Sequence, residues 1–400
     1  MEAGPVYIHD SDDDDLEYII DGREAVVEKA SFAASHPRIL EGLQCLTVAN
    51  DSPLDLLDNT EECKTYHETL YSVLRVILSQ AKKLRVVKFV FLPLPLKLYE
   101  AIMTLPNLHT LIMIGCSANY KTTEPRPFAS SSSVTNLFVG ILDTDIWWLV
   151  PNIKNIRVMS ITSIRSEEHD RNIVPPQQYI NTINPFQALE KLCIFDLRAQ
   201  DVPKLISWVK TTNQNAPLYL THLKLSGEVP FSLRILPDIL STFGTPTMQY
   251  LTLRAVADAP PPLLKHLAKA FPNLISLTLT LSNQESTSGA SVIWPHSCAG
   301  YAAMLSEFHC LRYFRWNHNL GFANLSDRSD GERALNALQD DAKTFATKVP
   351  SLEYIDFSER GMSALGFRIR RNDSGDVSLD ISFRLNFDPY DPDPITAHTG

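Results

Sequence analysis

The chain has 400 residues, 44% of them hydrophobic, and a formal net charge of -10, so it is long and apolar enough to bury a large core. Residues 1–40 hold ten acidic and three basic residues, and residues 386–400 hold three acidic and no basic ones, which leaves the body of the chain neutral. Because a surface for nucleic acid or anionic lipid needs a basic stripe, this balance argues against both nucleic-acid and membrane partners.

The first element along the chain is an acidic segment, residues 1–31, which we expect to be disordered. Within it, VYIHDSDDDDLEYI joins a short apolar, β-prone run to four aspartates and resembles a SUMO-interacting motif. The residues that carry the resemblance are Val6, Tyr7, Ile8, Asp12 and Asp13. Such a run can add an edge strand to a partner while the acids meet a basic rim, and phosphorylation of Ser11 would add negative charge. The alternative is a solubilising tail without a specific partner.

A short apolar pattern, L-x-x-L-x-L with any large apolar residue at the marked places, recurs between residues 32 and 385. The eleven matches begin at Leu43, Leu84, Leu108, Val134, Ile153, Leu189, Leu220, Met248, Leu274, Leu311 and Leu352. Several follow the same lead-in, such as LPNL at 105 and FPNL at 271. The alternation predicts a strand with one buried face, and its recurrence predicts stacked repeats that bury their apolar faces against each other.

Helical periodicity fills the intervals between these strands. Apolar residues recur at helical spacing within residues 64–84, 201–212, 260–271 and 331–349. We therefore predict an α/β fold, an irregular leucine-rich-repeat solenoid with a curved, mainly parallel sheet and outer helices, in one domain over residues 32–385. The spacing ranges from 19 residues (Val134 to Ile153) to 41 (Leu43 to Leu84), which leaves an alternative of unrelated strands in an ordinary α/β domain.

Targeting and cysteine patterns bear on the compartment. The start MEAGPVYIHD lacks the basic and apolar regions of a secretory signal, and the sequence has no run of about 18 apolar residues. The six cysteines form no CxxC pair, which favours reduced thiols. We expect a soluble monomer in the cytoplasm or nucleus, with an acidic, proline-rich tail over residues 386–400.

The familiar motifs of enzymes are missing from the sequence. It has no phosphate-binding loop, dinucleotide fingerprint, GxSxG or HExxH, so we expect no cofactor and no enzymatic activity. Residues 166–171, SEEHDR, offer candidate metal ligands, but adjacent side chains in a loop rarely reach one ion, and we favour a solvated loop without metal. His309 beside Cys310 suggests a nucleophile and its base, although a core cysteine beside a surface histidine is favoured. An enzyme with a non-standard site is the competing class of function.

The irregular repeats, the PNL lead-ins and the segment FAASHPRILEGLQCLTV (32–48) resemble the leucine-rich-repeat half of fungal F-box proteins, over residues 32–385. In that family an N-terminal F-box docks on the Skp-type adaptor of cullin ubiquitin ligases, and the repeats hold the substrate. The resemblance implies an F-box-like substrate receptor, or a scaffold derived from one. Residues 1–31 contain no LPxE helix, so we expect adaptor docking to be weak or missing. A structural or interaction protein regulated through its N-terminal motif is the other alternative.

A partner-binding surface follows from the strand pattern. In L-x-x-L-x-L the third, fifth and seventh positions leave the core and are expected to face the concave side of the solenoid. In the last repeats these positions are rich in Tyr and Arg, which are enriched at interface hot spots. The predicted contact residues for a protein partner are Tyr250, Arg254, Tyr313, Arg315, Asn317, Tyr354 and Asp356. The alternative is cross-strand stacking that only stabilises the sheet.

The early repeats differ at the same positions. Their outward side chains are Val86, Val90, Ile112, Ile114 and Phe138. These are too apolar to be left bare, so we expect the serine-rich insertion at 117–133, or a neighbouring segment, to cover them.

Overall fold

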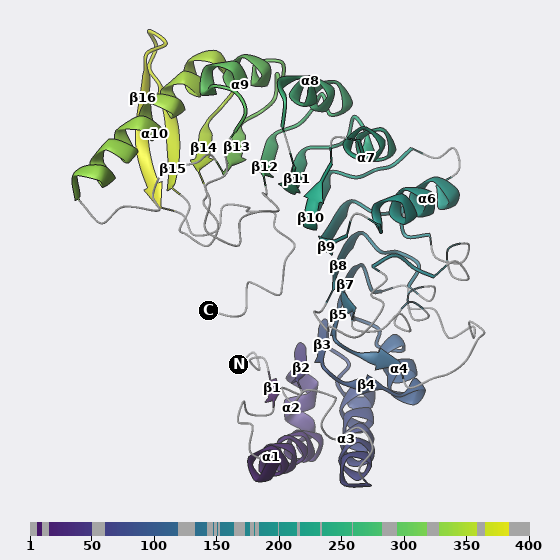
Figure 1. Ribbon diagram of the computed structural model, residues 1–400. Coiled ribbons are helices and arrows are strands. Elements are labelled where there is room, and N and C mark those ends of the chain that lie inside the picture. Colours follow the sequence, from purple (N-terminus) through teal and green to yellow (C-terminus); the bar gives the residue numbers. More distant parts are fainter. Residues whose placement is uncertain are drawn as a thin grey trace. The chain divides into compact units, whose positions relative to one another are not determined.

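A computed structural model divides the chain into two compact units, Met1–Leu189 and Glu190–Gly400, whose elements are labelled in Figure 1. The residues it describes are 6–9, 16–49, 61–118, 133–141, 147, 150, 153–163, 173–176, 180, 184–198, 200–213, 217–232, 234–257, 259–281, 294–317, 328–357 and 365–383. The division differs from the prediction of one domain over residues 32–385. Because stacked repeats contact mainly their neighbours, a solenoid has no single core that would tie all of its repeats together.

The first unit is a parallel sheet with short helical connections. In chain order its elements are β1 (Val6–His9), α1 (Leu16–Ala34), α2 (Pro37–Gly42), β2 (Cys45–Ala49), α3 (Glu61–Gln80), β3 (Val86–Val90), β4 (Pro93–Leu94), α4 (Leu96–Met103), β5 (Thr110–Ile114), β6 (Ser117–Ala118), β7 (Asn136–Ile141) and β8 (Val158–Ser163). The main sheet has the order β1-β2-β3-β5-β7-β8, and a small parallel pair joins β4 to β6. Parallel neighbours in chain order are what a repeated strand and crossover connection produces.

The second unit repeats this plan and ends in a hairpin. Its elements are β9 (Lys191–Leu197), α6 (Val202–Thr212), β10 (His222–Phe231), α7 (Leu236–Phe243), β11 (Tyr250–Val256), α8 (Pro261–Ala270), β12 (Ser276–Leu281), α9 (Cys298–Leu305), β13 (Tyr313–Trp316), α10 (Arg328–Lys348), β14 (Tyr354–Phe357), β15 (Leu365–Arg371) and β16 (Val377–Phe383). Strands β9 to β14 are parallel and follow chain order, whereas β14, β15 and β16 pair antiparallel. Helices α6 to α9 lie along one side of these strands (Figure 1).

The pairing register confirms the predicted repeats. The middle apolar residue of each repeat lies beside that of the next and is buried: Leu46, Val87, Leu111, Leu137 and Met159 in the first unit, and Leu192, Leu223, Leu251, Leu277, Phe314 and Ile355 in the second. The fold is therefore an α/β leucine-rich-repeat solenoid. The FPNLISLTLTL segment places Leu274 in the core before β12, and Leu277 and Leu279 within it.

One predicted match is displaced by three residues. The pattern assigned to Ile153 belongs at Ile156, because the buried residues that pair with β7 are Met159 and Ile161. The amide of Ile153 donates to the carbonyl of Val150 at 3.0 Å, so Ile153 lies in a turn before the strand. The sequence IKNIRVMSI satisfies the template at both starting points, and only strand pairing distinguishes them.

The N-terminal segment is more ordered than predicted. Strand β1 extends the first sheet by pairing parallel to β2. Helix α1 begins at Leu16, within residues 1–31, which we expected to be disordered. Buried Val26, Ala30 and Ala33 follow helical spacing, and α1 packs against α3. The many carboxylates of this region obscured that apolar stripe. Asp12 and Asp13, and the tail 386–400, lie outside the described residues.

The recurrent PN lead-in has a structural explanation. The side-chain amide of Asn107 donates to the carbonyl oxygen of Lys82 at 2.8 Å, and Asn273 donates to that of Pro246 at the same distance. Each asparagine therefore donates to a main-chain carbonyl in the equivalent turn of the preceding repeat. Cys116 similarly binds the preceding repeat, since its Sγ lies 3.6 Å from the carbonyl oxygen of Phe89 on the preceding strand.

Candidate partner-binding face and adjoining pocket

The third and fifth positions of the repeats lie on one face of each sheet, called the strand face here. Strand pairing in the second unit aligns them in two rows. The first row is Lys191, His222, Tyr250, Ser276, Tyr313 and Tyr354. The second row is Cys193, Lys224, Thr252, Thr278, Arg315 and Asp356. These rows contain most of the predicted contact residues.

Aromatic side chains dominate the first row. The rings of His222 and Tyr250 stack with their centroids 4.2 Å apart and 15° between their planes. Burial, with a smaller contribution from the ammonium of Lys191, lowers the pKa of His222 to about 4, so the ring is neutral at pH 7. Further along, the guanidinium of Arg312 lies 5.9 Å from the ring centroid of Tyr313. Tyr250 and Tyr313 are both partly exposed, so this row offers aromatic area to a partner.

The second row contains a buried ion pair. Two guanidinium nitrogens of Arg315 lie 2.5 Å from Oδ2 of Asp356, whose residue is only 2% exposed. Burial raises the pKa of Asp356, and Arg315 acts in the opposite direction. In the same row, the ammonium of Lys224 lies 4.7 Å from the ring centroid of Phe195. Removing one member of a buried pair leaves the other charge uncompensated, so Arg315 acts in the structure of the sheet.

The predicted contact residues therefore fall into two groups. Tyr250, Arg254 and Tyr313 are partly exposed. The others have structural contacts: Arg315 pairs with Asp356, Asn317 donates to the Leu281 carbonyl at 2.7 Å and accepts from its amide at 2.8 Å, and Tyr354 is 7% exposed. These four residues hold other parts of the fold together, and the contact of any of the seven residues with a partner stays a prediction.

The C-terminal hairpin explains why Tyr354 and Asp356 on β14 are buried. Strand β15 pairs with β14 and places Gly366 opposite Asp356, and a Cβ atom on Gly366 would clash with the hydroxyl of Tyr354. Only a glycine leaves room for that ring. Sequence reasoning missed the hairpin although the signal was present, since two alternating runs flank the turn at Asn372 and Gly375, where Gly375 has a φ of 83°.

The strand face of the first unit mixes polar and apolar residues. Its third positions are Cys45, Val86, Thr110, Asn136 and Val158, and its fifth positions are Thr47, Lys88, Ile112, Phe138 and Ser160. Ile112 and Phe138 are 4% and 5% exposed, whereas Val86, Val90 and Ile114 are partly exposed. The expectation that a segment covers this face stays a prediction. Most of the proposed cover, residues 117–133, lies outside the described residues.

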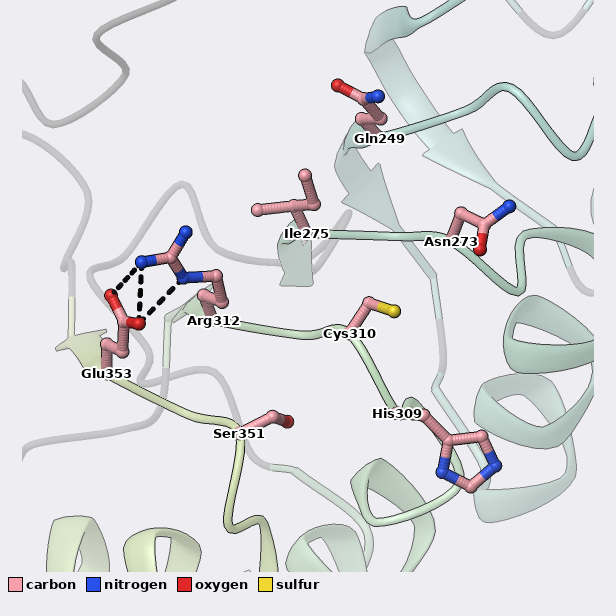
Figure 2. Close-up of a pocket in the computed structure, with 8 residues that line it drawn as sticks. All are labelled: Gln249, Asn273, Ile275, His309, Cys310, Arg312, Ser351 and Glu353. Carbon is pink, nitrogen blue, oxygen red and sulfur yellow. Dashed lines mark hydrogen bonds and ion pairs between the residues drawn. The ribbon is translucent and has the colours of Figure 1, made fainter.

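A pocket of about 600 Å³ adjoins the first row, at the N-terminal ends of β11 to β14 (Figure 2). It is lined by Gln249, Asn273, Ile275, His309, Cys310, Arg312, Ser351 and Glu353. Figure 2 shows Arg312 and Glu353 facing each other at one side of it, where Arg312 donates from Nε at 2.7 Å and from a terminal nitrogen at 2.9 Å. Both charged groups of the pocket therefore bind one another.

The residues considered for chemistry do not form a catalytic pair in this pocket. Cys310 is exposed in a turn, which corrects its assignment to the core, and His309 is exposed beside it. The described residues include no hydrogen bond between these two side chains, and Figure 2 shows them extending in different directions. In the part of the chain that is described, no group of three or more His, Cys, Asp or Glu side chains is arranged to hold a metal ion. The candidate ligands at 166–171 lie outside it.

Comparisons with known proteins give structural likenesses only. Neither a family model nor a curated protein matches the chain. An internalin from Listeria monocytogenes aligns over 85% of this chain and 95% of its own, with 15% identity and a TM-score of 0.29. TLR13 in a complex with single-stranded RNA aligns over 70% of this chain and 41% of its own, with 13% identity and a TM-score of 0.32. Among the helices of the described residues, none has the length and apolar character needed to cross a membrane.

Proposed function

We propose that the chain recognises another protein through the first row of the second unit, centred on His222, Tyr250 and Tyr313. The partly exposed tyrosines carry this proposal, because Tyr combines large contact area with a directed hydrogen bond. The adjoining pocket of about 600 Å³ extends the same surface with Gln249 and Asn273, whose amides can bond a partner's main chain. The mixed aromatic and polar character of this surface suits a transient interface rather than an obligate one.

The resemblance to fungal F-box proteins supports a finer proposal, in which the chain is an F-box-like substrate receptor or a scaffold derived from one. The resemblance does not extend to the part of the family that binds the adaptor. The N-terminal region lacks the LPxE helix and carries the aspartates 12–15, and burial of unpaired carboxylates in an apolar interface costs several kcal/mol. We therefore expect the full-length chain to bind a Skp-type adaptor weakly or not at all when the two are co-expressed. Stoichiometric co-purification would instead demonstrate an F-box that its sequence does not reveal.

A second candidate function rests on β1. This strand contains Val6, Tyr7 and Ile8 of the motif that resembles a SUMO-interacting sequence, and it is the terminal strand of its sheet. Its outer edge can therefore accept a strand from a partner while the other edge remains paired with β2. An NMR titration of labelled SUMO with the full chain tests this. Shift changes that disappear in Ile8→Asp support it, and unchanged spectra with the parent chain reject it.

An enzyme with a non-standard site is the weaker alternative. The pocket in Figure 2 holds one cation and one anion, Arg312 and Glu353, and these are bound to each other rather than aimed at a common point. Catalytic sites instead bring together titratable groups with matched pKa values around a reacting atom.

The proposed function is tested by affinity capture from cells with the tagged full-length chain, read by mass spectrometry. We expect the double substitution Tyr250→Ala and Tyr313→Ala to reduce recovery of the partner at least tenfold. Tyr219→Ala is the matched control, because Tyr219 is 55% exposed and does not belong to either row. Undiminished recovery in the double variant, or equal loss in the control, would reject the first row as the contact surface. A thermal melt of each variant separates lost contact from lost folding.

A further inference from the structure

A groove of about 560 Å³ lies between α7 and α8, on elements that take no part in the two rows. It is lined by Leu236, Pro237, Leu240, Ser241, Gly244, Pro260, Pro262, Leu263, His266, Lys269 and Ala270. The lining is mainly apolar. This surface is therefore chemically distinct from the polar pocket at the strand ends.

The local sequence explains why neighbouring helices leave this space open. Helix α7 ends at Phe243, and a Cβ atom on the following Gly244 would lie 2.7 Å from the carbonyl oxygen of Leu240, so a larger residue cannot fill the gap there. The facing positions, Ser241 and Ala270, also carry small side chains. Leu240 and Leu263 form the apolar floor, and each is largely buried by the helices themselves. The groove is thus a built feature of these two repeats.

The charged side chain that lines the groove is positive. Lys269, in the last turn of α8, is the only cation among the lining residues, all of which are described, and none of them is acidic. The nearest acid along α7, Asp238, is not part of the lining. Nδ1 of His266 lies 2.8 Å from the carbonyl oxygen of Pro262, which holds the ring at the edge of the groove.

We propose that the groove between α7 and α8 docks a short acidic, amphipathic segment of a partner protein, with leucine or phenylalanine side chains on the apolar floor and a carboxylate at Lys269. A volume of about 560 Å³ suits two or three such side chains. Helix-in-groove recognition uses apolar anchors three or four residues apart, and charge complementarity at the rim selects among segments that carry such anchors. The lining of the groove shares no residue with either row.

The probe for this proposal is a fluorescein-labelled peptide, LEELFEELLEE, measured by fluorescence anisotropy with the full-length chain at physiological salt. Two further peptides define specificity, one with every glutamate replaced by lysine and one with every leucine and phenylalanine replaced by serine. We expect saturable binding of the first peptide and at least tenfold weaker binding of the other two. Equal binding of the lysine peptide, or no saturable binding of LEELFEELLEE, would overturn the proposal.

Two variants with matched controls locate the binding. Lys269→Glu reverses the rim charge, and Lys210→Glu reverses a lysine in the corresponding last turn of α6, outside the groove. Ser241→Trp fills the groove, and Ser207→Trp adds the same ring to an exposed position of α6. We expect each groove variant to weaken peptide binding at least tenfold and each control to change it less than twofold. Weakening by both members of a pair, with unchanged melting temperatures, would place the peptide elsewhere and reject the groove.

Discussion

The fifth position of the repeat differs in character between two strands of the first unit and the last strands of the second. Strands β5 and β7 present Ile112 and Phe138, which are apolar and buried, whereas β12 to β14 present Thr278 and the buried pair Arg315 and Asp356. The three apolar positions of the template are the same in both units. The comparison teaches that those three positions specify the stacked strands, while the residues between them determine whether a strand face is apolar or polar.

The largest effect should come from the ion pair of the second unit. Arg315→Ala leaves the carboxylate of Asp356 buried without its cation, and we expect the free energy of unfolding to fall by about 3–5 kcal/mol. Lys88, at the fifth position of β3 in the first unit, is only partly buried, so Lys88→Ala should cost less than about 1 kcal/mol. Urea denaturation measures both. Similar losses in the two variants would contradict the distinction between the units.

The buried apolar side chains on the strand face of the first unit should produce the next largest effect. Ile112→Ala removes a buried side chain and leaves a cavity, with an expected cost of about 2–4 kcal/mol in the free energy of unfolding. Thr278→Ala, at the fifth position of β12, should cost about 1 kcal/mol or less, because Thr278 is closer to the surface and loses little apolar area. If Ile112→Ala is as mild as Thr278→Ala in urea denaturation, the face of the first unit is open rather than covered.

The pH dependence of stability compares one histidine from each unit. Burial lowers the pKa of His67 to about 4, with a further contribution from Arg23, and the pKa of His222 is lowered to the same value. Between pH 6.5 and 4 the unfolded chain binds more protons than the folded one, so stability should decrease as the pH falls through this range. We expect each histidine to contribute about 1–2 kcal/mol after allowing for solvent screening.

The measurement is urea denaturation from pH 4.5 to 7.5 of the parent chain, His67→Gln and His222→Gln. Each substitution should flatten the decrease by a similar amount. The raised pKa of Asp356 contributes the opposite slope at the acid end, so the comparison is made between each variant and the parent. An unchanged slope in His222→Gln would show that this ring protonates freely in the folded chain.

The smallest effect should be shared equally by the two units. Asn107→Ala and Asn273→Ala each remove one side-chain bond to the preceding turn, and each should lower the free energy of unfolding by about 0.5–1.5 kcal/mol. Because both side chains are exposed and the bonds have equal length, the two losses should agree within about 0.5 kcal/mol. A clearly larger loss in Asn273→Ala would assign this residue an additional role in the pocket of Figure 2.

Strand positions were predictable because burial repeats with the strand period. Leu251 and Leu277, for example, lie side by side as the alternation requires. The displaced match at Ile153 shows the limit, since two overlapping templates fit one segment and only pairing with β7 separates them. Helix α1 was not predicted, because acidic residues surround its apolar stripe in the sequence. The antiparallel pairing of β15 with β14 could not be predicted, because nothing in the local sequence links the two strands.

The sequence indicates less about the contacts of the candidate residues than about the strands. Alternation correctly assigns Arg315 and Asp356 to the strand face, but it does not tell whether two side chains on neighbouring strands, 41 residues apart, will bind each other. The exposure of a strand-face residue depends on what pairs beside it, as the hairpin beside Tyr354 demonstrates. Sequence periodicity therefore indicates which face a residue occupies, and tertiary contacts determine whether it remains available to a partner.

The side-chain hydrogen bonds that join a repeat to the preceding turn have a fixed order of donor and acceptor along the chain. Asn107 donates to the carbonyl of Lys82, and Thr247 donates to the carbonyl of Leu220 at 2.9 Å, so in both bonds the acceptor precedes the donor along the chain. During synthesis from the N-terminus, these acceptors therefore leave the ribosome before the side chains that donate to them. Neither bond has to wait for the C-terminal hairpin to be synthesised.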